Sequence, residues 1–363
     1  MALLEIKNLT FVYNSQEELA LDDMSLTIEE GEFVVVCGET GCGKTTLLKL
    51  LKKQLNPLGY KKGQILYKGT DISEMDERTA VTDIGYVMQN PDNQIVTDKV
   101  WHELAFGLES LGETSSVIRR KVAEITGFFG ITEWYRKKTS ELSGGQKQLL
   151  NLASIMVMKP KILILDEPTS QLDPIAASEF IAILDKINNE IGTTIILVEH
   201  RLEEVFPIAS KVVLMDKARV ILCDTPQMVG RQLKELEFHK MNYAMPSSIK
   251  IFNQLEIDDE CPLTVKEGRE FIQKHFNNKI DTLMIDNMDV HNREVALEIT
   301  DGYFRYQRNL PDVLNGLNLT IYKNEFVCIL GGNGAGKTTM LNILNGIRRL
   351  YRGRFRIQTN SFL

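Results

Sequence analysis

One segment of this chain occurs twice. Residues 31–51 read GEFVVVCGETGCGKTTLLKLL, and residues 324–344 read NEFVCILGGNGAGKTTMLNIL. The offset of 293 positions that relates Lys44 to Lys337 also aligns Tyr13 with Tyr306. Agreement without gaps over about thirty positions, at such a separation, indicates a duplicated domain rather than a short stacking repeat. Whatever fold the first copy adopts, the second copy is therefore expected to begin in the same way.

Both copies contain the pattern GxxxxGK[ST] between an apolar run and a helical pattern. Glycines at these places let backbone N–H groups turn toward a phosphate, while the lysine supplies a positive charge and the hydroxyl can bind Mg²⁺. The phosphate-binding residues expected in the first copy are Gly38, Gly41, Cys42, Gly43, Lys44, Thr45 and Thr46. Those expected in the second copy are Gly331, Gly334, Gly336, Lys337, Thr338 and Thr339. Because the pattern occurs twice in the same context, a chance match or a plain glycine turn explains it poorly.

Apolar runs alternate with helical patterns over residues 1–230, which predicts an α/β domain with a largely parallel sheet. The apolar runs expected to form strands are Phe33–Cys37, Ile162–Leu165, Thr194–Val198 and Val212–Met215. Residues 231–293 are more polar and are expected to form a helical appendage and a linker. Residues 294–363 are expected to be the N-terminal part of a second domain, truncated about 26 residues after Lys337.

Composition narrows the partners and the compartment. A net charge of −7 disfavours a general nucleic-acid binder, because neutralising phosphates requires surplus Lys and Arg. The five cysteines form no CxxC pair, which favours a reduced, cytosolic compartment, and Cys37 and Cys42 are expected to be packing residues. No run approaches 18 apolar residues, so no membrane-spanning segment is expected.

Further motifs follow the first phosphate loop in a fixed order. Gln89 lies in YVMQNPDNQ, and the sequence LSGGQ comes next. Asp166 and Glu167 then end the apolar run KILILDEP, Asp173 follows, and His200 ends the apolar run IILVEH. Over essentially all of residues 1–230, this order resembles the ABC ATPase family. The resemblance implies the P-loop NTPase fold of ABC ATPases, with a RecA-like core and antiparallel β and helical subdomains.

The resemblance also implies ATP as the substrate and Mg²⁺ as the cofactor. Glu167, Gln89 and His200 are then the catalytic residues, with Glu167 as general base and His200 at the γ-phosphate. Thr45, Gln89 and Asp166 are the metal-site residues, and Tyr13 and Tyr306 stack on adenine. An ordinary strand-end histidine and a core tyrosine remain the alternatives for His200 and Tyr13. The residues expected to act on ATP held by an opposite domain are Ser143, Gly145 and Gln146, and Gly144 and Asp173 are further expected nucleotide-binding residues.

The segment after Gln89, QNPDNQIVTDKVWHELAFGLESLG, resembles the ATPase subunits of energy-coupling factor (ECF) importers, including their tandem two-domain forms. This implies a peripheral protein at the cytoplasmic face of the cell membrane that energises uptake of a vitamin, vitamin precursor or transition-metal ion. Its partners would be a second ABC ATPase domain, in a homo- or heterodimer, a transmembrane coupling subunit and a substrate-binding membrane subunit. The residues expected at the membrane partner are Trp101, Phe106 and Leu108 through apolar area and Asp92, Asp98 and Glu103 through charge, although some of these residues are expected to belong to the core instead.

Two departures from the family pattern leave alternatives open. Leu149 stands where a basic residue usually follows the signature, and the second copy lacks the motifs that follow its phosphate loop. The chain could therefore be a soluble ABC-type ATPase, or a remnant of an interrupted tandem ATPase that binds ATP without hydrolysing it.

Overall fold

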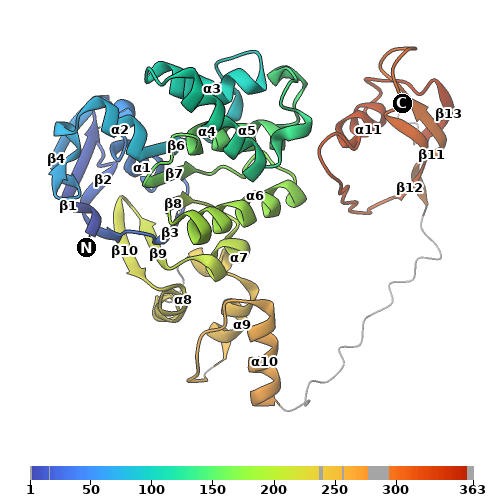
Figure 1. The fold of residues 1–363 in the computed structure, drawn as a ribbon. Helices are drawn as coiled ribbons and strands as arrows, with labels where there is room; N and C mark the ends of the chain where they lie inside the picture. The colour runs from blue at the N-terminus through green and yellow to red at the C-terminus, as the bar shows by residue number, and fades with distance from the viewer. Residues whose placement is uncertain (1, 16, 237–239, 256, 277–293, 358–363) are drawn as a thin grey trace. The chain divides into compact units, whose positions relative to one another are not determined.

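The computed structural model describes residues 2–15, 17–236, 240–255, 257–276 and 294–357 (Figure 1). The chain divides into two compact units, Met1–Lys279 and Ile280–Leu363. Among the described residues, none of the helices combines the length and the apolar character that a membrane crossing requires.

A six-stranded sheet in the order β10-β9-β3-β8-β7-β6 forms the centre of the first unit. Its strands are β3 (Phe33–Gly38), β6 (Ile84–Val87), β7 (Ile162–Asp166), β8 (Thr194–Val198), β9 (Lys211–Asp216) and β10 (Arg219–Asp224). All neighbours are parallel except the edge pair β9–β10. Every residue of β3, β7 and β8 is buried, because helices and a second sheet cover both faces, so these strands read as continuous apolar runs. The four strands expected from those runs are confirmed.

An antiparallel sheet in the order β2-β1-β4-β5 lies beside the parallel one. Its strands are β1 (Ala2–Tyr13), β2 (Leu21–Glu29), β4 (Gly59–Tyr67) and β5 (Thr70–Asp71). In β2, Met24, Leu26 and Ile28 are buried and the residues between them are exposed. This period of two is typical of a sheet that buries only one face.

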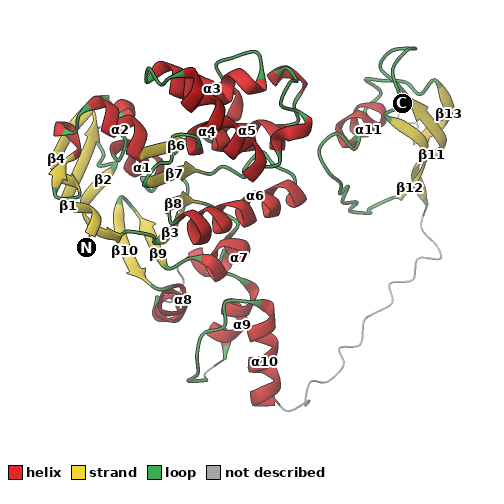
Figure 2. Ribbon diagram, in the orientation of Figure 1, coloured by secondary structure: helices red, strands yellow, loops and turns green. Residues whose placement is uncertain are grey.

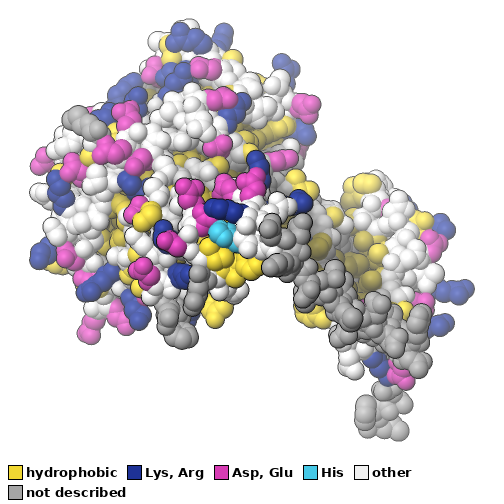
Figure 3. Space-filling model, turned by 90° about the horizontal axis from the view of Figure 1, so that it is seen from below, with side chains coloured by type: hydrophobic (Ala, Val, Ile, Leu, Met, Phe, Trp, Pro, Cys, Tyr) yellow, Lys and Arg dark blue, Asp and Glu magenta, His cyan; other side chains and the backbone are white. Residues whose placement is uncertain are grey.

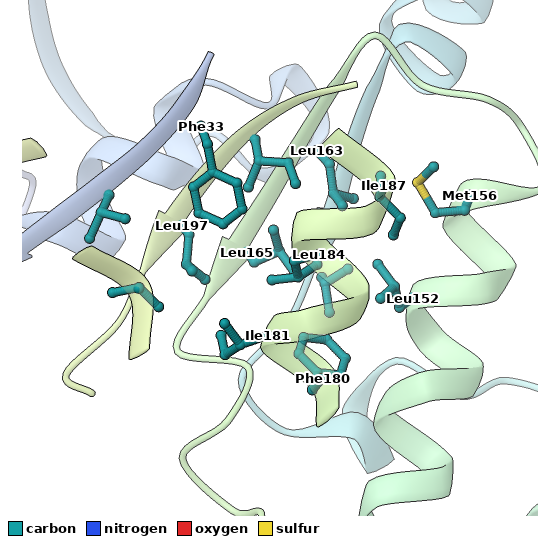
Figure 4. Packing of buried hydrophobic residues seen from close by; sticks show 14 of the residues in the cluster. Phe33, Leu152, Met156, Leu163, Leu165, Phe180, Ile181, Leu184, Ile187 and Leu197 are labelled. Atoms are coloured by element: carbon teal, nitrogen blue, oxygen red, sulfur yellow. The ribbon is translucent and has the colours of Figure 1, made fainter. Parts of the chain in front are cut away.

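Helices complete the first unit (Figure 2). They are α1 (Lys44–Leu50), α2 (Glu77–Asp83), α3 (Val100–Ser110), α4 (Ser115–Phe128), α5 (Gly144–Met156), α6 (Pro174–Lys186) and α7 (Leu202–Val205). Helices α3, α4 and α5 pack together as a helical group. Figure 4 shows Leu152 of α5 and Leu184 of α6 beside Leu163 of β7, so one apolar core joins the helical group to the sheet. The predicted fold class is confirmed: a parallel core, an antiparallel sheet and a helical part.

Three more α-helices follow the sheet, over the part of residues 226–276 that the structure describes. They are α8 (Pro226–Glu235), α9 (Ser247–Gln254) and α10 (Val265–Phe276). Phe252 of α9 and Phe271 of α10 pack edge to face with ring centres 5.5 Å apart, and both belong to the main core. On the face shown in Figure 3, acidic and basic side chains are interspersed rather than segregated by sign.

The second unit is a small antiparallel sheet with one helix among its described residues. It contains β11 (Val295–Phe304), β12 (Leu314–Tyr322), β13 (Arg352–Ile357) and α11 (Lys337–Leu344), with the strand order β12-β11-β13. Its core is small, built from Phe304, Leu314, Met340 and Ile343.

The segment that corresponds to β3 forms no strand in the second unit. Phe326 is 96% exposed, whereas its counterpart Phe33 is 1% exposed. In the first unit β3 pairs with β8 and β9, and the described part of the second unit contains no counterpart of those two strands. An apolar strand without neighbours can neither bury its side chains nor pair its backbone groups.

Candidate nucleotide site

The loop between β3 and α1 requires glycine at two positions. Gly38 and Gly43 have φ of 151° and 103°. A Cβ on Gly38 would lie 2.2 Å from the carbonyl oxygen of Met215, and one on Gly43 would lie 2.3 Å from that of Ala20. Both distances are far inside van der Waals contact, so a side chain at either place would displace backbone. Glycine at these two positions therefore lets the loop pack directly against the backbone of Met215 and Ala20.

Lys44 lies inside this loop, where it is 5% exposed. Its Nζ donates to the carbonyl oxygens of Gly38 at 2.8 Å and Glu39 at 2.9 Å. Within the described residues no carboxylate forms an ion pair with it. A buried cation that lacks an anion is costly, so this arrangement suits an anionic ligand such as phosphate.

A pocket of about 260 Å³ opens beside the loop, lined in part by Tyr13, Lys44, Thr45, Thr46 and Glu167. The hydroxyl of Tyr13 lies 2.9 Å from Oγ1 of Thr46, and its ring packs edge to face on Phe11. These contacts hold the Tyr13 ring at the side of the pocket, where a flat base could stack on it.

Thr45 and Asp166 form the second part of the site, the candidate metal position. The Thr45 hydroxyl donates to Oδ1 of Asp166 at 3.2 Å, and Tyr86 donates to Oδ2 at 3.2 Å. Burial raises the pKa of Asp166, and the hydrogen bonds from Thr45 and Tyr86 oppose that rise. A hydroxyl beside a carboxylate offers the oxygen ligands that Mg²⁺ prefers, so these residues fit the metal. Tyr86 was not predicted as a site residue, although it is the first residue of the segment YVMQNPDNQ that carries Gln89.

Glu167 has a partner on each carboxylate oxygen. Gln89 donates from Nε2 to Oε2 at 2.9 Å, and Nε2 of His200 lies 2.8 Å from Oε1. Where the carboxylate is ionised it only accepts, so His200 would donate to it through Nε2. The structure thus brings together all three predicted catalytic residues. The Gln89 side chain donates to Glu167 rather than to Thr45 or Asp166, the other two predicted metal-site residues.

The backbone at Glu167 is unusual as well. Its φ is 46°, a left-handed conformation that is uncommon outside glycine. Its N–H donates to the carbonyl oxygen of Val198 at 3.0 Å, which ties the end of β7 to β8. Strained residues of this kind persist only where the surroundings fix them, and they gather at functional sites.

Helix α5 holds the loop that carries Gln89. Gln148 donates to the carbonyl oxygen of Met88 at 3.3 Å, and Asn151 donates to that of Pro91 at 3.2 Å. Both side chains are fully buried. These two contacts lie on either side of Gln89 and were not predicted from the sequence.

The residues expected to act on an opposite domain, and Asp173, lie elsewhere. Ser143 and Gln146 exchange hydrogen bonds in a capping box at the start of α5, and Asp173 caps α6 through the N–H groups of Ile175 and Ala176. Together with Gly144 and Gly145, these residues are absent from the lining of the pocket beside Lys44. The structure therefore does not bring them to the loop of their own unit.

The segment expected at a membrane partner is exposed only in part. Trp101 and Phe106 are 39% and 40% exposed, so their side chains are accessible. Leu108 is fully buried on the core face of α3 and is therefore one of the core residues expected in this set. Glu103 is another, a 5% exposed side chain whose Oε2 accepts from the N–H groups of Val96 and Thr97.

The second unit repeats the loop geometry. Gly331, Gly334 and Gly336 have φ of 154°, 83° and 88°. Lys337 donates to the carbonyl oxygens of Gly331 and Gly332 at 2.6 and 2.8 Å. Tyr306 lies 2.9 Å from the hydroxyl of Thr339, as Tyr13 does from Thr46, and Thr338 occupies the place of Thr45.

Sequence comparison places these features in a family. Residues 21–170 and 314–363 match the family model described as ABC transporter. A protein from Bacillus thuringiensis subsp. konkukian, provisionally named an ABC transporter ATP-binding protein, is 42% identical over 353 residues, covering 96% of this chain and 63% of that protein. One of the same description from Methanosarcina acetivorans is 34% identical over 392 residues, covering 98% of this chain and 61% of that protein. The chain thus spans less than two thirds of these relatives.

Solved structures agree. The cbiO1 protein of Clostridium perfringens, described as part of the ABC transporter complex cbiONQ, superposes with a TM-score of 0.59 at 31% identity, over 69% of this chain and 98% of that one. A dimeric ATP-binding cassette bound to ADP and Pi shares the fold, with a TM-score of 0.54 at 24% identity over 61% of this chain and 98% of that one. The chain belongs to the ABC transporter family, as predicted, and its first unit has the fold of the family's ATP-hydrolysing cassettes.

Proposed function

We propose that this chain is the ATP-binding and ATP-hydrolysing subunit of an ECF-type importer. It would energise uptake of a vitamin, vitamin precursor or transition-metal ion through a separate membrane partner. The observation that carries the ATPase part is the placement of Glu167 between Gln89 and His200, in the lining of the pocket that also holds Lys44.

Binding of ATP follows from the loop and its lysine. The N–H groups after Gly38 and the buried charge of Lys44 suit the phosphates, and helix α1 begins at Lys44 with its positive end toward them. Tyr13 at the pocket side offers a ring face to the adenine. The phosphates would supply the negative charge that the buried ammonium group of Lys44 lacks. We therefore expect ATP binding to stabilise the first unit against unfolding.

Thr45 and Asp166 would hold Mg²⁺, which supplies neutralisation of charge on the phosphates during transfer to water. The side chain of Asp166 is already aligned by Thr45 and Tyr86 on its two oxygens. Little reorganisation is then needed at this carboxylate when the site is filled.

Glu167 has the position and chemistry of a general base. With one hydrogen bond to each oxygen, its carboxylate keeps further acceptor capacity for a water molecule. Gln89 and His200 fix its orientation, and fixed orientation at the reacting centre is the main contribution that a protein makes to phosphoryl transfer. His200 approaches Glu167 through Nε2, and we expect this ring nitrogen to exchange Glu167 for a γ-phosphate oxygen when ATP binds.

A second cassette would complete the site. Ser143, Gly145, Gln146 and Asp173 are absent from the pocket of their own unit, which supports a role toward ATP bound by a partner domain. That partner would be a second ABC ATPase domain, in a homodimer or a heterodimer. The second unit would be a partial copy of the first, and it keeps a phosphate loop around Lys337.

The similarity to cbiO1 supports the importer class, since that protein is described as part of an ABC transporter complex. Trp101 and Phe106 expose aromatic area on α3, within the segment 89–112 that carries the ECF-like sequence. We propose that a transmembrane coupling subunit docks here, that a further membrane subunit binds the solute, and that the chain lies at the cytoplasmic face of the cell membrane.

Co-purification tests this proposal. The tagged chain, expressed in its native host and extracted in mild detergent, should retain a small membrane-embedded subunit, and Trp101→Glu should release it. The control Tyr243→Glu changes another exposed aromatic, 84% exposed on the appendage, and should retain the subunit. Recovery of the wild-type chain without any membrane protein would contradict the importer assignment, while leaving the ATPase assignment intact.

A further inference from the structure

A buried carboxylate that the proposed chemistry does not use lies next to His200. Glu199 is 3% exposed. Its Oε1 accepts from the backbone N–H groups of His200 at 2.7 Å and Arg201 at 3.2 Å, and its Oε2 accepts from the hydroxyl of Thr169 at 2.5 Å. Thr169 is itself 2% exposed. Charged groups are rarely buried to this extent unless their hydrogen bonds are met, as they are here.

These hydrogen bonds join two loops that carry site residues. Strands β7 and β8 are parallel neighbours, so the loops at their carboxyl ends lie side by side. Thr169 belongs to the loop after β7, two residues beyond Glu167, and Glu199 lies in the loop after β8, beside His200. Glu199 therefore connects the segment of Glu167 to the segment of His200 beneath the surface of the site.

The connection acts on backbone positions rather than on the substrate. Glu199 is absent from the lining of the pocket, and its oxygens are directed to protein donors. The hydrogen bond from the His200 N–H to Glu199 fixes the backbone position from which the imidazole ring extends. Holding Thr169 constrains the chain that leaves Glu167, whose left-handed φ of 46° needs such support. Hydrogen bonds to a charged acceptor are stronger than those between neutral groups, so they are suited to holding the two loops in position.

We propose that Glu199 is a positioning residue that sets His200 against Glu167 by bonding the His200 backbone and Thr169 at once. The inference rests on the proposed function, because it assumes that His200 meets the γ-phosphate. Its consequence is specific: loss of the Glu199–Thr169 link should impair recognition of the γ-phosphate and leave the rest of the nucleotide site unchanged.

The test measures dissociation constants for ADP and for a non-hydrolysable ATP analogue, with Mg²⁺, on the full chain. Their ratio reports contacts to the γ-phosphate and needs no turnover. His200→Ala should lower the preference for the ATP analogue by about tenfold, the order expected for one charge-assisted hydrogen bond. Thr169→Val, which removes the hydroxyl at nearly constant volume, should lower it severalfold, and Thr169→Ser should restore it. ADP affinity and the thermal midpoint of the nucleotide-free chain separate misfolding from mispositioning.

Double variants decide whether Glu199 acts through His200. Adding Thr169→Val or Glu199→Ala to His200→Ala should cause no further loss of the preference for the ATP analogue. Substitutions along one chain of contacts remove the same interaction, so their effects on binding free energy do not add. Additive losses would overturn the inference, as would unchanged preference in Thr169→Val and Glu199→Ala while His200→Ala shows its loss. If His200→Ala itself changes nothing, the γ-phosphate role in the proposed function fails and the inference fails with it.

Discussion

The side-chain amide of Gln89 lies 2.9 Å from Oε2 of Glu167, although 78 positions separate the two residues in the chain. The contact exists because β6 and β7 are parallel neighbours, so the loops that follow them meet at one edge of the sheet. One carboxylate oxygen of Glu167 therefore forms a hydrogen bond with Gln89, and the other forms one with His200. The orientation of the proposed base is thus determined by two separate loops.

Gln89→Ala should lower kcat for ATP hydrolysis by about tenfold to a hundredfold with little change in ATP affinity, because it removes an orienting contact rather than a binding one. Steady-state phosphate release and equilibrium nucleotide binding measure the two quantities. Gln54→Ala is the matched control, since Gln54 makes a similar bond to Glu77 on an exposed surface. An unchanged kcat in Gln89→Ala would contradict the orienting role.

Asp166→Asn should abolish most hydrolysis, by more than about a hundredfold, because it weakens the proposed metal site. It should also stabilise the nucleotide-free chain at neutral pH. Since burial raises the pKa of Asp166, the folded chain holds this proton more tightly than the unfolded chain does. Wild type therefore loses stability as pH rises from the ordinary value of 3.8 toward the raised one, and the variant does not. Thermal midpoints should diverge in favour of the variant over that interval; midpoints that stay parallel would contradict this account.

Lys44→Ala and Lys337→Ala should affect nucleotide binding differently. Lys44 is buried and lines a pocket together with Glu167, whereas the described part of the second unit contains no counterpart of Glu167. We expect Lys44→Ala to remove the tighter ATP site, by about a hundredfold in affinity, and Lys337→Ala to leave that site unchanged. Titration calorimetry separates the two, and loss of the tighter site in Lys337→Ala would reverse their assignment.

The repeat offers a matched pair of core and surface substitutions. Phe33→Ala should cost about 3–5 kcal/mol in the first unit, because it opens a cavity between fully buried strands. Both tryptophans, Trp101 and Trp134, lie in that unit, so their fluorescence reports its unfolding in urea. Phe326→Ala should change stability by less than about 0.5 kcal/mol and should reduce concentration-dependent light scattering, since the lost side chain is exposed. If Phe326→Ala leaves the light scattering unchanged, the exposed Phe326 side chain does not promote self-association.

Local patterns in the sequence predicted much of the site. The phosphate loop, the strand that ends at Asp166 and the strand before His200 are each encoded within about ten residues, so reading along the chain recovers them. The Gln148 and Asn151 contacts and the Glu199–Thr169 bond depend on how distant loops meet, and the spacing of residues does not reveal them. Glu199 did leave a signal, an acidic residue directly after an apolar strand, but its partner could be found only in three dimensions.

Burial on α3 was harder to predict for a related reason. Trp101, Phe106 and Leu108 all read as apolar, and only the packing of α3 against α5 decides that Leu108 faces the core. Likewise, the exposure of Phe326 follows from the neighbours of its segment rather than from its own sequence, which closely matches that of β3.

The central claim is that Glu167 activates water for hydrolysis of ATP held at Lys44, and one comparison tests it most directly. Phosphate release by the wild-type chain and by Glu167→Gln should be measured with Mg²⁺ and saturating ATP, at the protein concentration that gives the highest turnover. The account predicts at least about a hundredfold slower release by the variant, with ATP binding retained. Equal rates for the two proteins would contradict it.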